Sequence, residues 1–124
     1  MNQVPHIVCV DDNEQSRILM SDLLSYHGYY VTTYSSGESF LQSNCVETMD
    51  LLFLDICMPQ MSGTDCLLML QDREIVKVPV IALTALALKD EISELLTYGF
   101  HEIITKPIDI QLIAKEVAKL CPIH

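Results

Sequence analysis

Five side chains with reactive groups stand at the ends of short apolar runs or directly beyond them. They are three carboxylates, one hydroxyl and one ammonium group, namely Asp11, Asp12, Asp55, Thr84 and Lys106. Three neighbouring carboxylates repel one another, so they need a cation to remain ionised together. Their oxygen atoms suit Mg²⁺, or Mn²⁺ in its place, because the sequence offers no histidine or cysteine cluster of the kind that binds zinc. A carboxylate beside such an ion can attack phosphorus and form an acyl phosphate.

Five apolar or β-branched runs are expected to form strands, and they alternate with five segments expected to form helices. The predicted strands are His6–Asp11, Tyr29–Tyr34, Leu51–Leu54, Val78–Thr84 and His101–Thr105. The predicted helices are Asn13–Gly28, Ser36–Asn44, Ser62–Arg73, Leu88–Gly99 and Asp109–Cys121. This alternation predicts one domain, residues 1–124, with a flavodoxin-like α/β fold. The expected sheet is doubly wound and parallel, with strand order 2-1-3-4-5 and helices on both faces.

In a doubly wound sheet, ligands bind beyond the carboxyl ends of the strands. Taken singly, Asp11 and Asp12 could cap a helix, and Asp55 could simply begin a loop. Helix capping does not explain why four different strands each end near a reactive side chain. Taken together with Thr84 and Lys106, the three aspartates therefore predict a ligand-binding site. We expect Asp55 to be its nucleophile, because it ends the apolar run LLFL.

Composition and charge limit the partners that this chain can have. The 124 residues carry a net charge of −10, which repels nucleic acid, so we expect no direct binding of DNA or RNA. The five cysteines form no C-x-x-C pair, which favours reduced thiols in a cytoplasmic protein. The sequence shows neither a signal peptide nor an apolar run long enough to cross a bilayer, so we expect no membrane insertion.

Four short motifs match a known family in order and spacing. They are VDDN at 10–13, LDICMPQMSG at 54–63, LTA at 83–85 and TKP at 105–107. Together they resemble the four signatures of two-component response-regulator receiver domains, and the resemblance covers essentially the whole chain. It extends to stand-alone receivers and to the receivers of hybrid kinases. The resemblance implies a phosphorelay protein that takes a phosphoryl group from a histidine of a sensor kinase or of a phosphotransfer protein.

The resemblance also implies a role for most of the site residues. Asp55 would accept the phosphoryl group. Asp12, Asp55 and the backbone carbonyl of Cys57 would bind Mg²⁺ directly, and Asp11 would hold the ion through water. Lys106 would pair with the phosphoryl oxygens.

Three further positions follow from the same resemblance. Thr84 would move to hydrogen-bond a phosphoryl oxygen, and the peptide bond before Pro107 would be cis. The sequence departs from the family at Ile103, where receivers usually carry a tyrosine or phenylalanine that turns inward on activation. Phosphorylation of Asp55 should survive this change. The aromatic side chain that usually changes position on activation is missing.

In the family's fold, two side chains flank the path by which water reaches the phosphorus, and here they are Cys57 and Leu86. Neither holds a water molecule firmly, so we expect a phospho-acceptor with slow self-dephosphorylation rather than an enzyme. The segment LALKDEISELL at 86–96 has more apolar residues than one buried stripe requires. It predicts a partner-binding surface, shared with the last strand and last helix, in a monomer or weak dimer.

Three other functions compete with this interpretation. A haloacid-dehalogenase-type phosphatase also uses an aspartate at a strand end, but it needs a second acid two residues later, where Cys57 stands. A flavodoxin-like cofactor binder needs a hydroxyl- and glycine-rich phosphate loop in place of DDNEQ. A pseudo-receiver binds partners without phosphorylation and lacks one or more site residues, whereas all five are present here.

Overall fold

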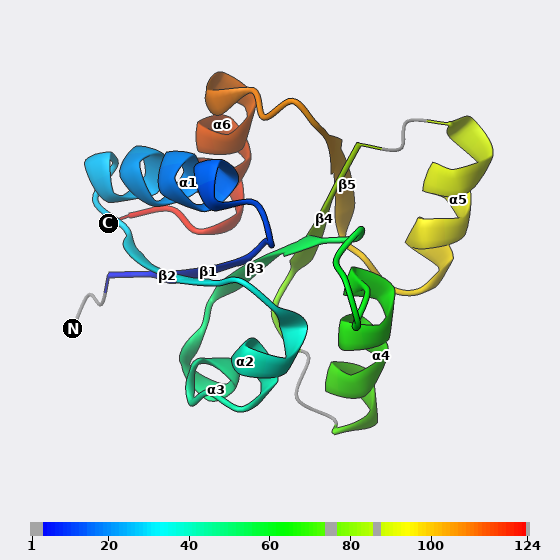
Figure 1. Cartoon of the computed structure of the whole chain (residues 1–124). Helices are drawn as coiled ribbons and strands as arrows, with labels where there is room; N and C mark the ends of the chain where they lie inside the picture. Colours follow the sequence, from blue (N-terminus) through cyan, green and yellow to red (C-terminus); the bar gives the residue numbers. More distant parts are fainter. Residues whose placement is uncertain (1–3, 74–76, 86–87, 124) are drawn as a thin grey trace.

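The fold is described by a computed structural model that covers residues 4–73, 77–85 and 88–123. The strands are β1 (His6–Val10), β2 (Tyr30–Tyr34), β3 (Leu51–Asp55), β4 (Val80–Thr84) and β5 (Glu102–Thr105). The helices are α1 (Glu14–Tyr26), α2 (Gly37–Leu41), α3 (Cys45–Thr48), α4 (Gly63–Asp72), α5 (Lys89–Thr97) and α6 (Ile110–Leu120). Figure 1 shows how these elements surround the sheet.

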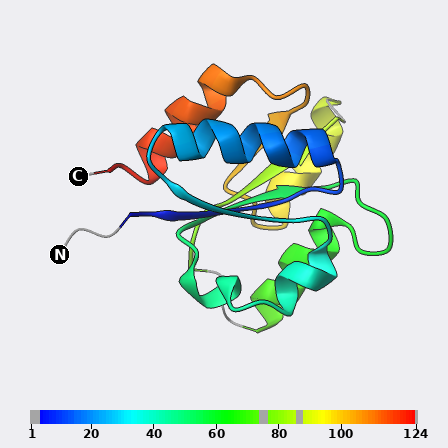
Figure 2. The ribbon, with the colours of Figure 1, turned by 60° about the vertical axis from the view of Figure 1, so that its left-hand side comes forward.

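The five strands form one parallel sheet in the order β2-β1-β3-β4-β5. Helices α1 and α6 cover one face, and α2, α3, α4 and α5 lie on the other (Figures 1 and 2). The predicted doubly wound fold and its strand order are therefore confirmed. Because all strands run the same way, their carboxyl ends meet at one edge of the sheet.

Two apolar layers hold the sheet between its helices. Strands β1, β3 and β4 are buried along their whole length, because helices cover both of their faces. Successive residues of β3 alternate between the layers: Phe53 packs with α1 and α6, whereas Leu52 and Leu54 pack on the side of α4. A close-packed interior is difficult to deform, so the ends of these strands are firmly positioned.

Helix α1 buries a face that its apolar spacing does not reveal. The spacing of four residues, Ile18, Leu19, Leu23 and Tyr26, predicts a helix. Leu23 is partly buried against the core, but the side chains of Ile18, Leu19 and Tyr26 are 52%, 39% and 86% exposed. Met20 and Leu24, which lie one turn apart, are fully buried instead. The helix carries more apolar residues than one face can hold, so its packing against the sheet decides which of them are buried.

The helix predicted over Ser36–Asn44 ends earlier in the structure, at Leu41 of α2, and the one-turn α3, which was not predicted, begins at Cys45. Ser36 caps α2, with its hydroxyl accepting a backbone hydrogen bond. The Ser43 hydroxyl donates to the Phe40 carbonyl over 2.6 Å and accepts from the Cys45 N–H over 3.2 Å. A serine that takes these backbone partners competes with the helix, so the chain turns there and begins α3.

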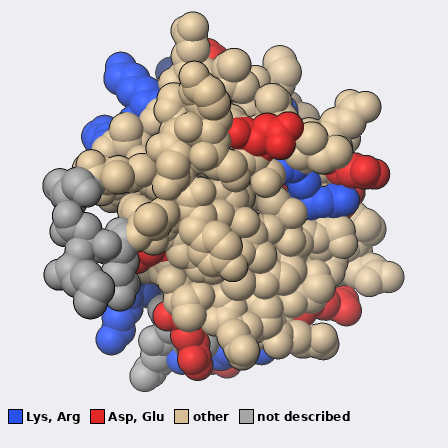
Figure 3. Space-filling view, turned by 90° about the vertical axis from the view of Figure 1, so that its left-hand side faces the viewer, with Lys and Arg blue, Asp and Glu red and all other residues tan. Residues whose placement is uncertain are grey.

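Two surface features bear on possible partners. None of the helices in the described ranges is long and apolar enough to span a bilayer. On the face shown in Figure 3, Lys and Arg side chains are scattered and do not gather into one patch.

The close approach of α4 to the end of β3 depends on Gly63. This residue begins α4, and its N–H donates to the Ile56 carbonyl over 3.0 Å. A Cβ at this position would clash with the backbone carbonyl oxygen of Asp55 and would stand 2.9 Å from its carbonyl carbon. Both are backbone atoms of the strand end, so neither can move aside cheaply.

We expect Gly63→Ala to lower the free energy of unfolding by about 2 kcal/mol or more, because the methyl group would force β3 and α4 apart. Chemical denaturation followed by circular dichroism measures this change. Asp72→Ala, at the exposed end of α4, is the control and should change the free energy by about 0.5 kcal/mol or less. Equal stability of Gly63→Ala and the parent would contradict the close approach.

Candidate functional site

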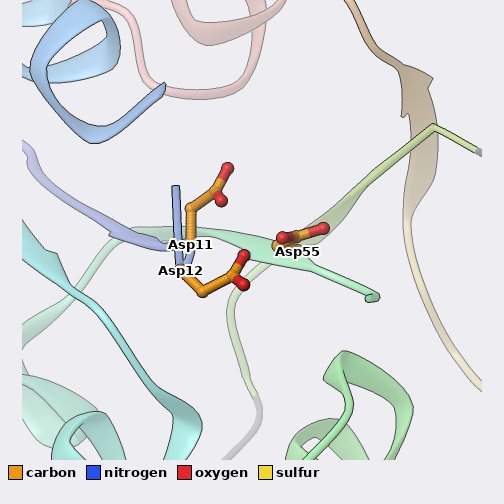
Figure 4. A group of neighbouring side chains, drawn as sticks. All are labelled: Asp11, Asp12 and Asp55. Atoms are coloured by element: carbon orange, nitrogen blue, oxygen red, sulfur yellow. The ribbon is translucent and has the colours of Figure 1, made fainter. Parts of the chain in front are cut away.

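Three carboxylates meet at the carboxyl edge of the sheet (Figure 4). Asp11 and Asp12 follow β1, and Asp55 is the last residue of the neighbouring strand β3. One oxygen atom of each carboxylate lies within 4.8 Å of the corresponding atoms of the other two. Asp11 and Asp55 are 0% and 4% exposed, whereas Asp12 is exposed. Two of three like charges are therefore held out of water, which is costly unless a cation offsets them.

Lys106 reaches these carboxylates from the loop that follows β5. Its Nζ lies 2.9 Å from Asp11 Oδ2 and 3.6 Å from Asp55 Oδ2. Burial alone would lower the pKa of Lys106, but the hydrogen bonds and charges of Asp11 and Asp55 outweigh burial and raise this pKa above its ordinary value. The ammonium group is therefore held as a cation between two acids.

Thr84 is the last residue of β4 and is fully buried at the same edge. Its strand lies between β3, which ends in Asp55, and β5, which leads to Lys106. The Lys106 N–H donates to the Thr84 carbonyl oxygen over 2.7 Å, and the peptide bond from Lys106 to Pro107 is cis. The structure thus places the five residues singled out from the sequence at one edge of the sheet.

Backbone N–H groups hold the two buried carboxylates in place. The Asn13 N–H donates to Asp11 Oδ1 over 2.9 Å, and the N–H of the exposed Cys57 donates to Asp55 Oδ1 over 3.3 Å. Sequence reasoning missed Arg17, whose Nη1 donates to the Asp11 backbone carbonyl over 2.8 Å. No motif marks this contact in the sequence, because only the turn into α1 brings the two residues together.

The pKa of Asp55 is raised to about 7, chiefly by burial and next by the charge of Asp11, and the charge of Lys106 offsets this only in part. At neutral pH the side chain is therefore close to balance between carboxyl and carboxylate. A divalent cation would favour the carboxylate, since one ammonium group does not neutralise three acids. The donors are all oxygen atoms, which fits Mg²⁺ or Mn²⁺.

The remaining predicted positions concern the switch and the partner surface. Ile103, in β5, is half-buried and packs against the core on the side of α4. Leu86 lies outside the residues that the structure describes. Leu88, just before α5, and Leu96, within it, are 67% and 46% exposed, so both are open to contact with a partner.

Comparison with known proteins assigns the family. A family model described as a response regulator receiver domain matches residues 7–118. The chain belongs to this family. Receiver domains act in two-component signalling, and they are typically phospho-acceptors rather than classical enzymes.

The receiver domain has relatives of two kinds. The polar-differentiation response regulator DivK of Brucella ovis is 33% identical over 105 residues, which cover 84% of this chain and 85% of DivK. The sensor histidine kinase GacS of Pseudomonas protegens is 33% identical over 122 residues, which cover 95% of this chain but only 13% of GacS. Among solved structures, the Vibrio cholerae chemotaxis protein CheY4 is 23% identical, with a TM-score of 0.86 over 95% of this chain and 99% of that chain. This last likeness shows the fold.

Ionisation of Asp55 should destabilise the receiver domain when divalent cations are absent. A carboxyl group whose pKa rises from 3.8 to about 7 on folding contributes stability at low pH and loses it as the pH rises through 7. Asp55→Asn does not titrate, so at about pH 8 it should be more stable than the parent by on the order of 2 kcal/mol. At about pH 4 the two proteins should be equally stable.

Urea denaturation at the two pH values measures this difference. Asp65→Asn, at an exposed position of α4, is the matched control and should show no such dependence on pH. Addition of Mg²⁺ at the higher pH should stabilise the parent and remove the advantage of Asp55→Asn. A stability difference that is the same at both pH values would show that Asp55 does not titrate in this way.

Proposed function

We propose that the receiver domain accepts a phosphoryl group onto Asp55 from a phosphohistidine of a sensor kinase or of a histidine phosphotransfer protein. The proposal depends on one observation: three carboxylates and the Lys106 ammonium group meet at one sheet edge in a chain of this family. Asp12, Asp55 and the backbone carbonyl of Cys57 would hold Mg²⁺ or Mn²⁺, and Asp11 would bind it through water. When bound, the ion would neutralise charge on the phosphoryl oxygens.

Asp55 is better placed as a nucleophile than the other two acids. Asp11 is fully buried, and its Oδ2 lies 2.9 Å from Lys106 Nζ, so its carboxylate is already engaged. Asp12 is exposed, where water stabilises its charge and weakens its reactivity. Asp55 lies between these extremes, with Oδ1 held by the Cys57 N–H and Oδ2 in a longer, 3.6 Å contact with Lys106.

In the transfer step, a carboxylate oxygen of Asp55 attacks the phosphorus, and the P–N bond of the phosphohistidine breaks. The electron pair of that bond stays on the imidazole nitrogen, and the ring leaves as neutral histidine because its other nitrogen carries a proton. Lys106 then pairs with one phosphoryl oxygen, and the Thr84 hydroxyl donates to another. These groups stabilise charge where it develops, so they contribute to the rate as well as to binding.

Phosphorylation would switch a partner-binding surface on α5, β5 and α6. Leu88 and Leu96 are exposed there and supply apolar contacts for an output partner. Ile103 is half-buried and packs against the core, so a movement of Thr84 would reach the surface of β5 through it. Because isoleucine is smaller than the usual aromatic residue, the change that it transmits to the surface is smaller.

The phosphorylated protein should lose its phosphoryl group slowly. Water must attack the phosphorus opposite Asp55, and a side chain two residues after Asp55 borders that path. This side chain is the exposed Cys57, whose thiol is a weak hydrogen-bonding group and does not orient a water molecule. A long-lived acyl phosphate suits a receiver that stores or relays the group.

Incubation with Mg²⁺ and acetyl phosphate should add one phosphoryl group to the parent and none to Asp55→Asn, because an amide is not a nucleophile at neutral pH. Intact mass spectrometry detects the adduct. The exposed Asp65→Asn variant is the matched control and should be phosphorylated like the parent. Phosphorylation of Asp55→Asn would show that Asp55 is not the acceptor. A parent that gains no phosphoryl group would favour the pseudo-receiver, which binds partners without phosphorylation.

Cys57→Asn should shorten the lifetime of the phosphorylated protein by about tenfold, a barrier change of about 1.4 kcal/mol, because an amide can orient the attacking water. The decay of the phosphorylated mass over time measures this lifetime. Cys57→Ala is the control, since it also removes the thiol but offers no hydrogen bond, and it should decay at the rate of the parent. Equal decay of all three proteins would mean that residue 57 does not set the lifetime.

A further inference from the structure

A cavity between α4 and α5 places acidic groups beside apolar ones, away from the site described above. This α4–α5 cavity has a volume of about 220 Å³ and is lined by Ile56, Thr64, Glu91, Glu94, Leu95 and Tyr98. Helix α5 buries none of its described residues, in contrast to α4, which stands beside it in Figure 1 and buries four. The loose packing of α5 leaves this space open between the two helices.

The walls of the α4–α5 cavity are largely apolar. Ile56 is buried, and Leu95 and Tyr98 are partly buried against the core on the same side of the sheet. Two carboxylates border this apolar space, from Glu91 and Glu94, and no lysine, arginine or histidine is among the lining residues. The cavity therefore combines an apolar surface with two carboxylates that no basic lining residue accompanies.

One carboxylate oxygen in this wall has no partner. Glu91 Oε2 is shielded from solvent and makes no hydrogen bond within the described chain. Glu94 is exposed, and its Oε1 accepts a long hydrogen bond, 3.4 Å, from the Tyr98 hydroxyl. Buried carboxylate oxygens are nearly always bonded to donors, because an unpaired one loses its hydration without compensation. Among the described residues no donor serves Glu91 Oε2, which leaves this oxygen open to a cationic group of a partner.

We propose that the α4–α5 cavity binds an arginine side chain of a partner protein. The methylene groups of arginine would lie against Ile56, Leu95 and the ring of Tyr98, as long basic side chains commonly do on apolar surfaces. Its guanidinium group has several N–H donors in one plane, which can serve two carboxylates at once. A neutral apolar ligand would leave Glu91 Oε2 unpaired, and an anion would be repelled. The net charge of −10 also attracts a basic partner.

The contacts of this binding site do not require a phosphoryl group on Asp55, although α5 also belongs to the surface that phosphorylation is proposed to switch. None of the lining residues belongs to the group of three carboxylates or contacts Lys106. The experiment therefore uses the unphosphorylated protein, with Mg²⁺ present so that the three carboxylates are not free to capture the probe.

The probe is the peptide acetyl-Gly-Arg-Gly-amide, and its matched control replaces arginine with citrulline, which has nearly the same shape but no charge. Titration of the ¹⁵N-labelled protein with the arginine peptide should shift the backbone amides of Ile56, Leu95 and Tyr98 to saturation. The citrulline peptide should bind at least about tenfold more weakly, because it cannot form charge-assisted hydrogen bonds.

Two variants complete the test. Glu91→Gln should weaken binding of the arginine peptide by about tenfold. Glu47→Gln removes the same charge from the exposed surface of α3 and should leave the affinity unchanged. The proposal is overturned by equal binding of the two peptides, by unchanged affinity of Glu91→Gln, or by shifts that centre on Asp11, Asp12 and Asp55. The absence of any saturable shift would also overturn it.

Discussion

The mutual repulsion of three carboxylates is the constraint on which the site of this receiver domain depends. Their oxygen atoms lie within 4.8 Å of one another, and two of the three side chains are almost completely removed from water. Left alone, such groups take up protons or move apart. Burial is the larger cause of the raised pKa of Asp55, and the charge of Asp11 raises it further. Lys106 offsets the repulsion only in part. The remaining negative charge favours a divalent cation at this edge of the sheet, which fits the proposed transfer of a phosphoryl group to Asp55.

The sheet can hold this arrangement because the strands that carry the acids are buried on both faces. Val10 and Leu54, directly before the acids, are register partners in neighbouring strands, so the positions of the side chains that follow are set by the sheet itself. Gly63 lets α4 close against the end of β3, where any side chain would meet backbone atoms. A tightly packed interior yields little, so the carboxylates cannot relieve their repulsion by moving apart.

Helix α5 has the opposite character. It buries none of its described residues, and it borders a cavity on the side of α4 while Leu96 remains exposed. Segments with few buried contacts change position at low cost, which is what a surface that responds to a distant chemical change requires. The central strands therefore hold the charges in place, whereas the loosely packed α5 has the freedom to move that the proposed partner-binding surface requires.

The strands and the five reactive residues could be predicted from the sequence alone, because apolar runs form buried strands and parallel strands bring their ends to one edge. Tertiary structure was needed for the buried face of α1, for the break at Ser43 and for the contact of Arg17 with the Asp11 carbonyl. It was also needed for the unpaired oxygen of Glu91. The physical reason is common to these features. Each depends on which atoms of different segments meet, whereas periodicity and motif spacing report only the conformation and chemistry of one segment at a time.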